Sequence, residues 1–117
     1  MLTDRTERFL AAELIREQLF LALRQEVPYA LAVLIEDWQD RPAGDTVISA
    51  TIIVERDSQR AIVLGKGGAM IRQVGTTARG AISDLVQRPT HLKLHVKVDS
   101  GWTTSPEALA RYGYSQS

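Results

Sequence analysis

The sequence predicts an α+β domain in which helices pack on one face of a three-stranded sheet. Two patterns predict this class: residues 90–98 alternate strictly between apolar and polar side chains, and residues 68–87 repeat apolar side chains at helical spacing. The expected order is helix, strand, strand, helix, glycine loop, helix, strand and tail. A length of 117 residues suits one domain, residues 1–117, with a short tail from about residue 99.

Residues 5–25 are predicted to form the first helix. Asp4 followed by Glu7 is a candidate capping pair at its start. Pro28 ends the segment, because proline cannot continue a helix and disfavours helical geometry in the residue before it. The apolar side chains recur every three or four residues, which predicts one buried face: Phe9, Ala12, Ile15, Leu19 and Leu23.

Two strands are predicted next, joined by a short turn. Residues 30–38 show little alternation, which predicts a strand buried on both faces or nearly so. Residues 40–45 form a turn cluster, and residues 46–56 alternate as a second strand. Because the connection is short, the two strands are expected to pair antiparallel. In the second strand one face carries Ile48, Ala50, Ile52 and Val54, and the other carries Ser49, Thr51 and Glu55.

The second half contains two predicted helices around the glycines and a final strand. Residues 58–64 are predicted to form a short helix capped by Asp57 or Ser58, although their apolar run also fits a buried strand. The longer helix, residues 68–87, is stopped by Pro89. In the tail, residues 107–111 could form one or two helical turns. The apolar side of the longer helix contains Met70, Ile71, Val74, Ala78, Ile82, Leu85 and Val86.

The loop Gly65-Lys66-Gly67-Gly68 carries the main functional hypothesis. A helix begins directly after it, so unpaired N–H groups and the helix dipole favour a bound phosphate. Glycine lacks a Cβ atom, which allows a phosphate backbone to approach closely and permits positive φ. Lys66 adds a cation. These features predict a loop of the GxxG kind, which clamps about four nucleotides of RNA.

The loop has three alternative interpretations. A P-loop requires Ser or Thr after its lysine, whereas Lys66 is followed by Gly67. A dinucleotide-binding fingerprint requires a third glycine where Met70 stands. A ligand-free turn between two helices remains open, because a bare GxxG is a weak signal without its context.

An RNA strand bound at this loop would lie in a groove with two walls. One wall is expected on the flanking helices, with Val74 among its apolar residues, although plain core packing is the alternative for most of them. The other wall is expected on the second strand, residues 47–54, whose backbone groups would meet base edges. Arg79 lies seven residues beyond Arg72, so both can extend the phosphate track on one side of the helix. The candidate RNA-binding residues are Thr51, Ile62, Leu64, Gly65, Lys66, Gly67, Gly68, Ile71, Arg72 and Arg79.

The charge distribution supports a polyanionic ligand more than the total charge does. The formal net charge is zero, yet residues 56–79 contain Arg56, Arg60, Lys66, Arg72 and Arg79 against Asp57 alone. There is no cysteine, so disulfides and thiolate metal sites are excluded. His91 and His95 share a strand face without placed carboxylates, so no metal site is predicted. No apolar run reaches the length of a membrane span, and no catalytic constellation stands out.

Several longer segments carry a resemblance that covers nearly the whole chain: residues 2–5, 8–17, 26–33, 52–59, 64–68, 71–79 and 92–98, with Gly101-Trp102. Together they resemble the C-terminal KH domain of the bacterial Era GTPases. The resemblance implies a type II KH fold, α-β-β-α-α-β, with a mixed sheet. It also implies binding of single-stranded RNA, specifically the 3′ end of 16S ribosomal RNA, during assembly of the small (30S) ribosomal subunit.

The resemblance further implies a cytoplasmic protein whose full-length relatives have an N-terminal GTPase domain and contact the inner membrane surface. The chain itself contains neither a P-loop nor the guanine motif Asn-Lys-x-Asp, so it is expected to be no enzyme and to need no cofactor. The alternative function is a protein-interaction module that docks on a ribosomal protein or on a GTPase domain.

Overall fold

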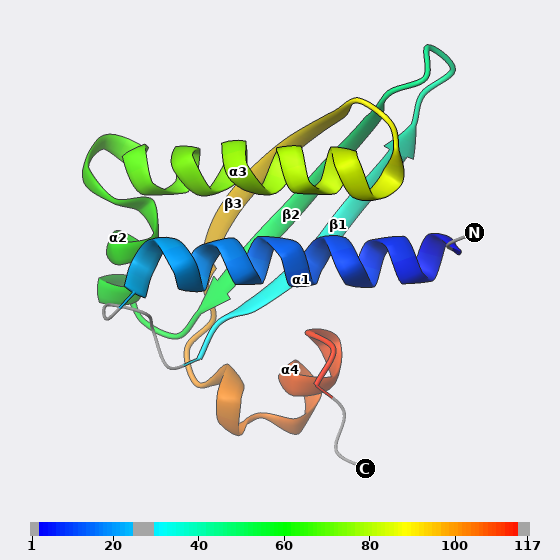
Figure 1. The fold of residues 1–117 in the computed structure, drawn as a ribbon. Coiled ribbons are helices and arrows are strands. Elements are labelled where there is room, and N and C mark those ends of the chain that lie inside the picture. Colours follow the sequence, from blue (N-terminus) through cyan, green and yellow to red (C-terminus); the bar gives the residue numbers. More distant parts are fainter. Residues whose placement is uncertain (1–2, 25–29, 115–117) are drawn as a thin grey trace.

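The computed structural model describes residues 3–24 and 30–114, and it confirms the predicted order of elements (Figure 1). Single 3-10 turns stand at Lys66–Gly68 and Trp102–Thr104. The helices and strands are α1 (Asp4–Leu23), β1 (Ala32–Asp40), β2 (Thr46–Val54), α2 (Asp57–Leu64), α3 (Ala69–Val86), β3 (Thr90–Val98) and α4 (Pro106–Arg111).

The sheet is mixed, and β2 is its central strand. The strand order is β1-β2-β3, with β1 antiparallel and β3 parallel to β2. The short turn after Asp40 allows the antiparallel pair, whereas the parallel pair requires the crossover through α2 and α3. Both edges of β2 are therefore used for pairing, and β1 and β3 form the two edges of the sheet.

The backbone of β3 is paired on one side only among the described residues. Thr46 N donates to Pro89 O at 2.9 Å, and Asp99 N donates to Val54 O at 2.8 Å. In a parallel ladder this pattern directs the backbone groups of the odd-numbered residues of β3 toward β2. The N–H and C=O groups of Leu92, Leu94 and the other even-numbered residues consequently point to the open edge.

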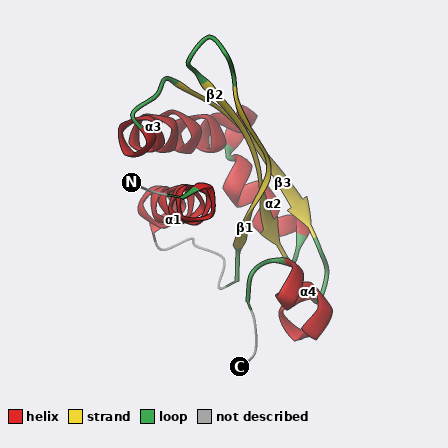
Figure 2. Ribbon diagram, turned by 90° about the vertical axis from the view of Figure 1, so that its right-hand side faces the viewer, coloured by secondary structure: helices red, strands yellow, loops and turns green. Residues whose placement is uncertain are grey.

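Helices α1 and α3 lie side by side on one face of the sheet, as Figures 1 and 2 show. The buried face of α1 differs from the prediction, because Phe9 is 63% exposed and Ala12 is only partly buried. Ala11 takes their place, so the buried residues follow a strict four-residue spacing. The core on this face contains Ala11, Ile15, Leu19 and Leu23 of α1, Ile48, Ala50, Ile52 and Val54 of β2, and Val74, Ala78, Ile82 and Val86 of α3.

The tail covers the opposite face of the sheet near the end of β2. Trp102 is 3% exposed and stacks edge-on against Tyr112, with ring centroids 5.6 Å apart. A second apolar cluster joins these rings and Ala108 to Ala32 and Ile53. The prediction of helices on one face is therefore right for α1, α2 and α3, whereas α4 packs on the other side (Figure 2).

The ends of the helices depart from the prediction in detail. Thr3 caps α1, because its side chain accepts a hydrogen bond from Thr6 N, so the predicted Asp4 cap is wrong. At the start of α2 the Gln59 side chain accepts from the backbone N–H groups of Glu55 and Arg56, and neither Asp57 nor Ser58 is the N-cap residue. Gln25 and Pro28, the predicted end of the first helix, lie outside the described residues.

Strand β1 begins and ends two residues later than predicted, and it is not buried on both faces. Of its residues only Ala32 is fully buried, while Glu36 and Asp37 are exposed. An irregularity between Ile35 and Asp37 shifts the register against β2. Its position at the sheet edge explains this exposure, which the weak alternation of its sequence does not indicate.

Candidate nucleic-acid interface

The glycine loop is a tight turn built from positive φ angles. Gly65, Gly67 and Gly68 have φ values of 72°, 61° and 77°, a region that side chains disfavour. Gly68 N donates to Gly65 O at 3.1 Å, which closes the turn. Lys66 and Gly67 are exposed at its tip. The sequence of three glycines therefore fixes a compact loop that presents backbone and one cation to solvent.

The loop opens directly onto the N-terminus of α3. Gly68 is the N-cap residue of α3, and no side chain caps this helix end. The N–H of Ala69, the first residue of α3, donates to Lys66 O, and the positive end of the helix dipole still favours an anion at this helix end. Arg72, one turn further, donates from Nη1 to Gly67 O at 2.8 Å. This hydrogen bond fixes the loop against α3 and places a guanidinium beside the turn.

A groove of about 320 Å³ continues from the loop between α3 and β3. Arg72 joins the two, because it contacts the loop and also lines the groove. The β3 wall is the open strand edge, where Leu92 and Leu94 present backbone donors and acceptors. The lining residues are Ile71, Arg72, Gly75, Thr76 and Arg79 of α3 and Leu92 and Leu94 of β3.

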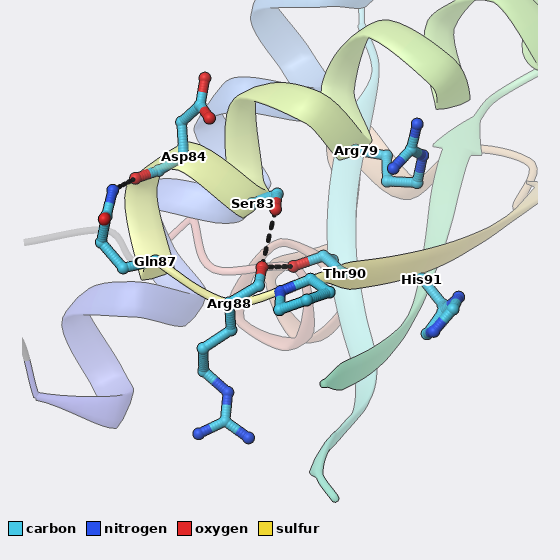
Figure 3. Close-up of a pocket in the computed structure, with 8 residues that line it drawn as sticks. Arg79, Ser83, Asp84, Gln87, Arg88, Thr90 and His91 are labelled. Carbon is cyan, nitrogen blue, oxygen red and sulfur yellow. Dashed lines mark hydrogen bonds between the residues drawn. The ribbon is translucent and has the colours of Figure 1, made fainter. Parts of the chain in front are cut away.

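A wider hollow of about 610 Å³ lies at the far end of α3 (Figure 3). Arg79 lines both this hollow and the groove, so the two adjoin at this residue. The connection from α3 to β3 is fixed there, because the hydroxyls of Ser83 and Thr90 donate to Arg88 O at 2.7 and 3.1 Å. Arg88 itself is turned toward the β1–β2 hairpin, where its Nε donates to Thr46 Oγ1 at 3.0 Å.

The structure brings most of the predicted site residues to one surface. Lys66, Arg72 and Arg79 are exposed cations along the loop and the groove, and Ile71 lines the groove between them. Ile62 and Leu64 are partly buried and do not line it, and Ile62 packs against the core. The predicted helix wall is therefore narrower than expected, since Val74 is also a core residue with 1% exposure.

The second wall was predicted on the wrong strand. Residues 47–54 belong to β2, whose backbone pairs with β1 on one side and β3 on the other, so its groups cannot meet base edges. Thr51 is 8% exposed and lies opposite Leu34 and His95, on the sheet face turned away from α3. Thr51 is thus separated from the groove by the sheet itself.

Sequence reasoning missed four groove residues: Gly75, Thr76, Leu92 and Leu94. One available signal was the strict alternation in residues 90–98, which marks a half-buried strand. A second signal was the strand–helix–helix–strand order, because it permits parallel pairing of the last strand beside β2 and leaves that last strand an edge. Together these observations could have assigned the wall to β3.

Within residues 3–24 and 30–114, no group of three or more His, Cys, Asp or Glu side chains is arranged to hold a metal ion. In the same part of the chain no helix is long and apolar enough to cross a lipid bilayer.

Comparison with known proteins assigns the fold and the loop to one class. Residues 26–103 match the KH domain family model, which includes β1, β2, the glycine loop and β3. The chain belongs to the KH domain family.

Curated relatives then confirm the resemblance to Era. The chain is 52% identical to GTPase Era of Thermotoga petrophila over 87% of its length, and 54% identical to GTPase Era of Nitratidesulfovibrio vulgaris over 91%. It covers 34% and 35% of those two proteins. The chain thus spans about a third of the curated relatives it matches.

Solved structures agree with these relatives. A crystal structure of Aquifex aeolicus Era bound to GDP and aluminium fluoride has a TM-score of 0.89 and 36% identity, over 99% of this chain and 39% of that one. A crystal structure of Era in complex with MgGDPNP and nucleotides 1506–1542 of 16S ribosomal RNA gives the same values.

Proposed function

We propose that this chain is a binding module for single-stranded RNA and that its ligand is the 3′ end of 16S ribosomal RNA during small-subunit assembly. The observation that carries the proposal is the continuity of the glycine loop, the N-terminus of α3 and the open β3 edge around one groove. The similarity to an Era structure solved with 16S ribosomal RNA nucleotides supports the choice of RNA.

The two sides of the site have different roles in this proposal. The loop and Lys66 meet phosphates, because amide N–H groups and an exposed ammonium favour anions and carry no base preference. Arg79 continues the phosphate contact along α3. The bases turn toward β3, where the outward N–H and C=O of Leu94 can pair with a base edge that offers an acceptor beside a donor, such as adenine or cytosine.

We assign no catalytic activity to the chain. The family that it matches is a KH domain, and the matches cover only part of proteins named GTPase. Hydrolysis of GTP, and contact with the inner membrane surface, are proposed for the remaining length of such relatives. A ribosomal RNA ligand implies that the chain works in the cytoplasm.

The decisive experiment replaces both tip residues of the loop, as Lys66→Asp with Gly67→Asp. Both residues are exposed, and a Cβ atom on Gly67 would meet nothing within 4 Å. The positive φ of Gly67 costs about 1 kcal/mol with a side chain, and aspartate is among the residues that adopt this conformation, so the fold should survive. The new carboxylates repel phosphates at the point of closest approach. Fluorescence anisotropy with an RNA oligonucleotide matching the 16S 3′ end should show tight binding by the wild type and none by the double variant.

A matched control makes the same charge change elsewhere, as Arg8→Asp with Gly44→Asp. Arg8 lies on α1 and Gly44 in the β1–β2 turn, both at the end of the molecule away from the loop (Figure 1). A Cβ atom on Gly44 would also meet nothing within 4 Å. If both double variants lost the same affinity, the loss would be due to the change in net charge and not to the position of the loop. If the wild type bound neither this oligonucleotide nor a scrambled one, the alternative of a protein-interaction module would replace the RNA proposal.

A further inference from the structure

Gly75 lies in α3 at the point where the groove is bounded by helix backbone alone. It lines the groove together with Arg72, Thr76 and Arg79 from the same helix, and it faces Leu94 of β3. A Cβ atom built on Gly75 would lie 3.6 Å from Leu94 Cδ1. Any side chain at this position would therefore extend into the groove, against the side chain of Leu94.

The fold does not require glycine at this position. Gly75 is not among the residues with positive φ, so its backbone conformation suits any residue. A distance of 3.6 Å to Leu94 is an ordinary van der Waals contact, so a methyl group would fit without displacement. Glycine in a helix interior is less stable than alanine, because it loses more conformational freedom on folding. Alanine would thus serve the fold at least as well.

Gly80, five residues further along α3, separates the effect of the helix from the effect of the groove. It also lacks a positive φ, and a Cβ atom on it would meet nothing within 4 Å. Gly80 lines neither the groove nor the hollow at the end of α3. The two glycines share one helix and one backbone conformation, and they differ in what lies in front of them.

We propose that the missing side chain at Gly75 keeps the groove deep enough for a nucleobase to lie between α3 and the outward backbone groups of Leu94. Gly75 is then a residue that determines which ligands fit, since it admits a flat ring beside the strand edge. The inference rests on the proposed RNA function and adds to it a position where bases, and not phosphates, are selected.

The test compares Gly75→Ala with Gly80→Ala in the 117-residue chain, using the 16S 3′-end oligonucleotide. Both variants should melt at the wild-type temperature or above, because alanine favours the helix. One methylene group in a closely fitting pocket changes affinity by about 10- to 200-fold. Gly75→Ala should therefore bind RNA about tenfold more weakly, and Gly80→Ala should bind like the wild type. Gly75→Leu, which fills more of the groove, should lose more affinity than Gly75→Ala, and Gly80→Leu should not.

A second measurement needs no substitution. In amide NMR spectra of the wild type, added RNA should shift the signals of Gly75 and Leu94 and leave that of Gly80 in place. Wild-type affinity in Gly75→Ala, or unshifted Gly75 and Leu94 signals with bound RNA, would overturn the inference and leave the proposed function standing. Failure of the wild type to bind RNA would remove both.

Discussion

A Cβ atom on Gly65 would lie 2.6 Å from the Cβ of Met70, closer than two such atoms approach in real proteins. The same atom would stand 2.9 Å from Met70 N, which is backbone and cannot rotate away. A Cβ atom on Gly67, two residues further along the same loop, would meet nothing within 4 Å. The two glycines therefore serve different purposes: Gly65 permits the loop to pack onto the start of α3, and Gly67 leaves the tip bare.

Gly65→Ala should destabilise the fold, whereas Gly67→Ala should be tolerated. Gly67 has φ 61° and ψ 21°, and a side chain in this left-handed region costs about 1 kcal/mol. Gly65 has φ 72° and ψ 175°, a region almost restricted to glycine, and a side chain there costs about 1–3 kcal/mol. Gly65→Ala adds a clash with Met70, and overpacking of this kind costs about 1–3 kcal/mol more. Urea unfolding of the two variants measures the difference directly. Equal midpoints would show that α3 can shift to make room.

The salt dependence of RNA binding should identify the phosphate contacts. For a single strand, each neutralised phosphate adds about 0.7 to the slope of log affinity against log salt concentration. Lys66→Ala should lower this slope by about that amount, because Lys66 is an exposed cation at the loop tip. Arg8→Ala, on the distant end of α1, should leave it unchanged. If the Lys66→Ala variant kept the wild-type slope, Lys66 would not contact a phosphate.

The turn between β1 and β2 should contribute stability that is lost in acid. The pKa of the Asp45 carboxyl is lowered from 3.8 to about 2, chiefly because it accepts hydrogen bonds from the guanidinium of Arg41. Burial opposes this shift, and the hydrogen bond with His91 Nε2, 3.0 Å away, contributes to it. A depressed pKa stabilises the fold above pH 4, and this contribution disappears as the pH falls toward 2. Asp45→Asn should therefore lower the melting temperature at pH 6 and have progressively less effect below pH 4. Asp84→Asn is the control outside this ion pair, and an Asp45 effect that persisted at pH 2 would contradict the assignment.

The tail should stabilise the domain through Trp102. This side chain is 3% exposed between the sheet and Tyr112, and replacement of a buried Trp by Ala costs about 3–5 kcal/mol. Among the described residues its Nε1 has no hydrogen-bond partner. Trp102→Phe, which keeps a ring and removes an unpaired donor, should therefore cost much less than Trp102→Ala. Urea unfolding measures the loss of stability in each variant. If the folded fraction of each variant still binds RNA with wild-type affinity, Trp102 stabilises the fold and takes no part in the groove.

The periodicity of apolar residues predicted most of the helices and strands. It failed where burial of a residue depends on which elements pack against it in the folded domain. The alternation of residues 90–98 predicted β3 with its bounds, because a half-buried strand must alternate. The buried face of α1 was predicted partly from Phe9 because its side chain is apolar, but the helix turns Ala11 inward. A small residue is buried there because α1 packs closely against α3, and that distance is a tertiary property.

The loop half of the site could be predicted, because its chemistry is contained in four consecutive residues. The glycines of this loop have positive φ and no Cβ atom, and a helix begins directly after Gly68. All three properties can be inferred from the local sequence. The opposite wall could not be found from alternation alone, because Leu94 reaches the groove through strand order. The connection between β2 and β3 decides which of the two strands lies at the edge of the sheet. The residue pattern within β2 contains no information about this connection.

The parallel pairing of β2 and β3 has a consequence for synthesis. β2 ends at Val54 and the loop is complete at Gly68, yet the opposite wall begins only at Thr90. A chain emerging from a ribosome therefore exposes its glycine turn well before any groove exists, and contacts between distant segments form slowly. In the proposed function, selection of bases therefore requires that β3 has joined the sheet.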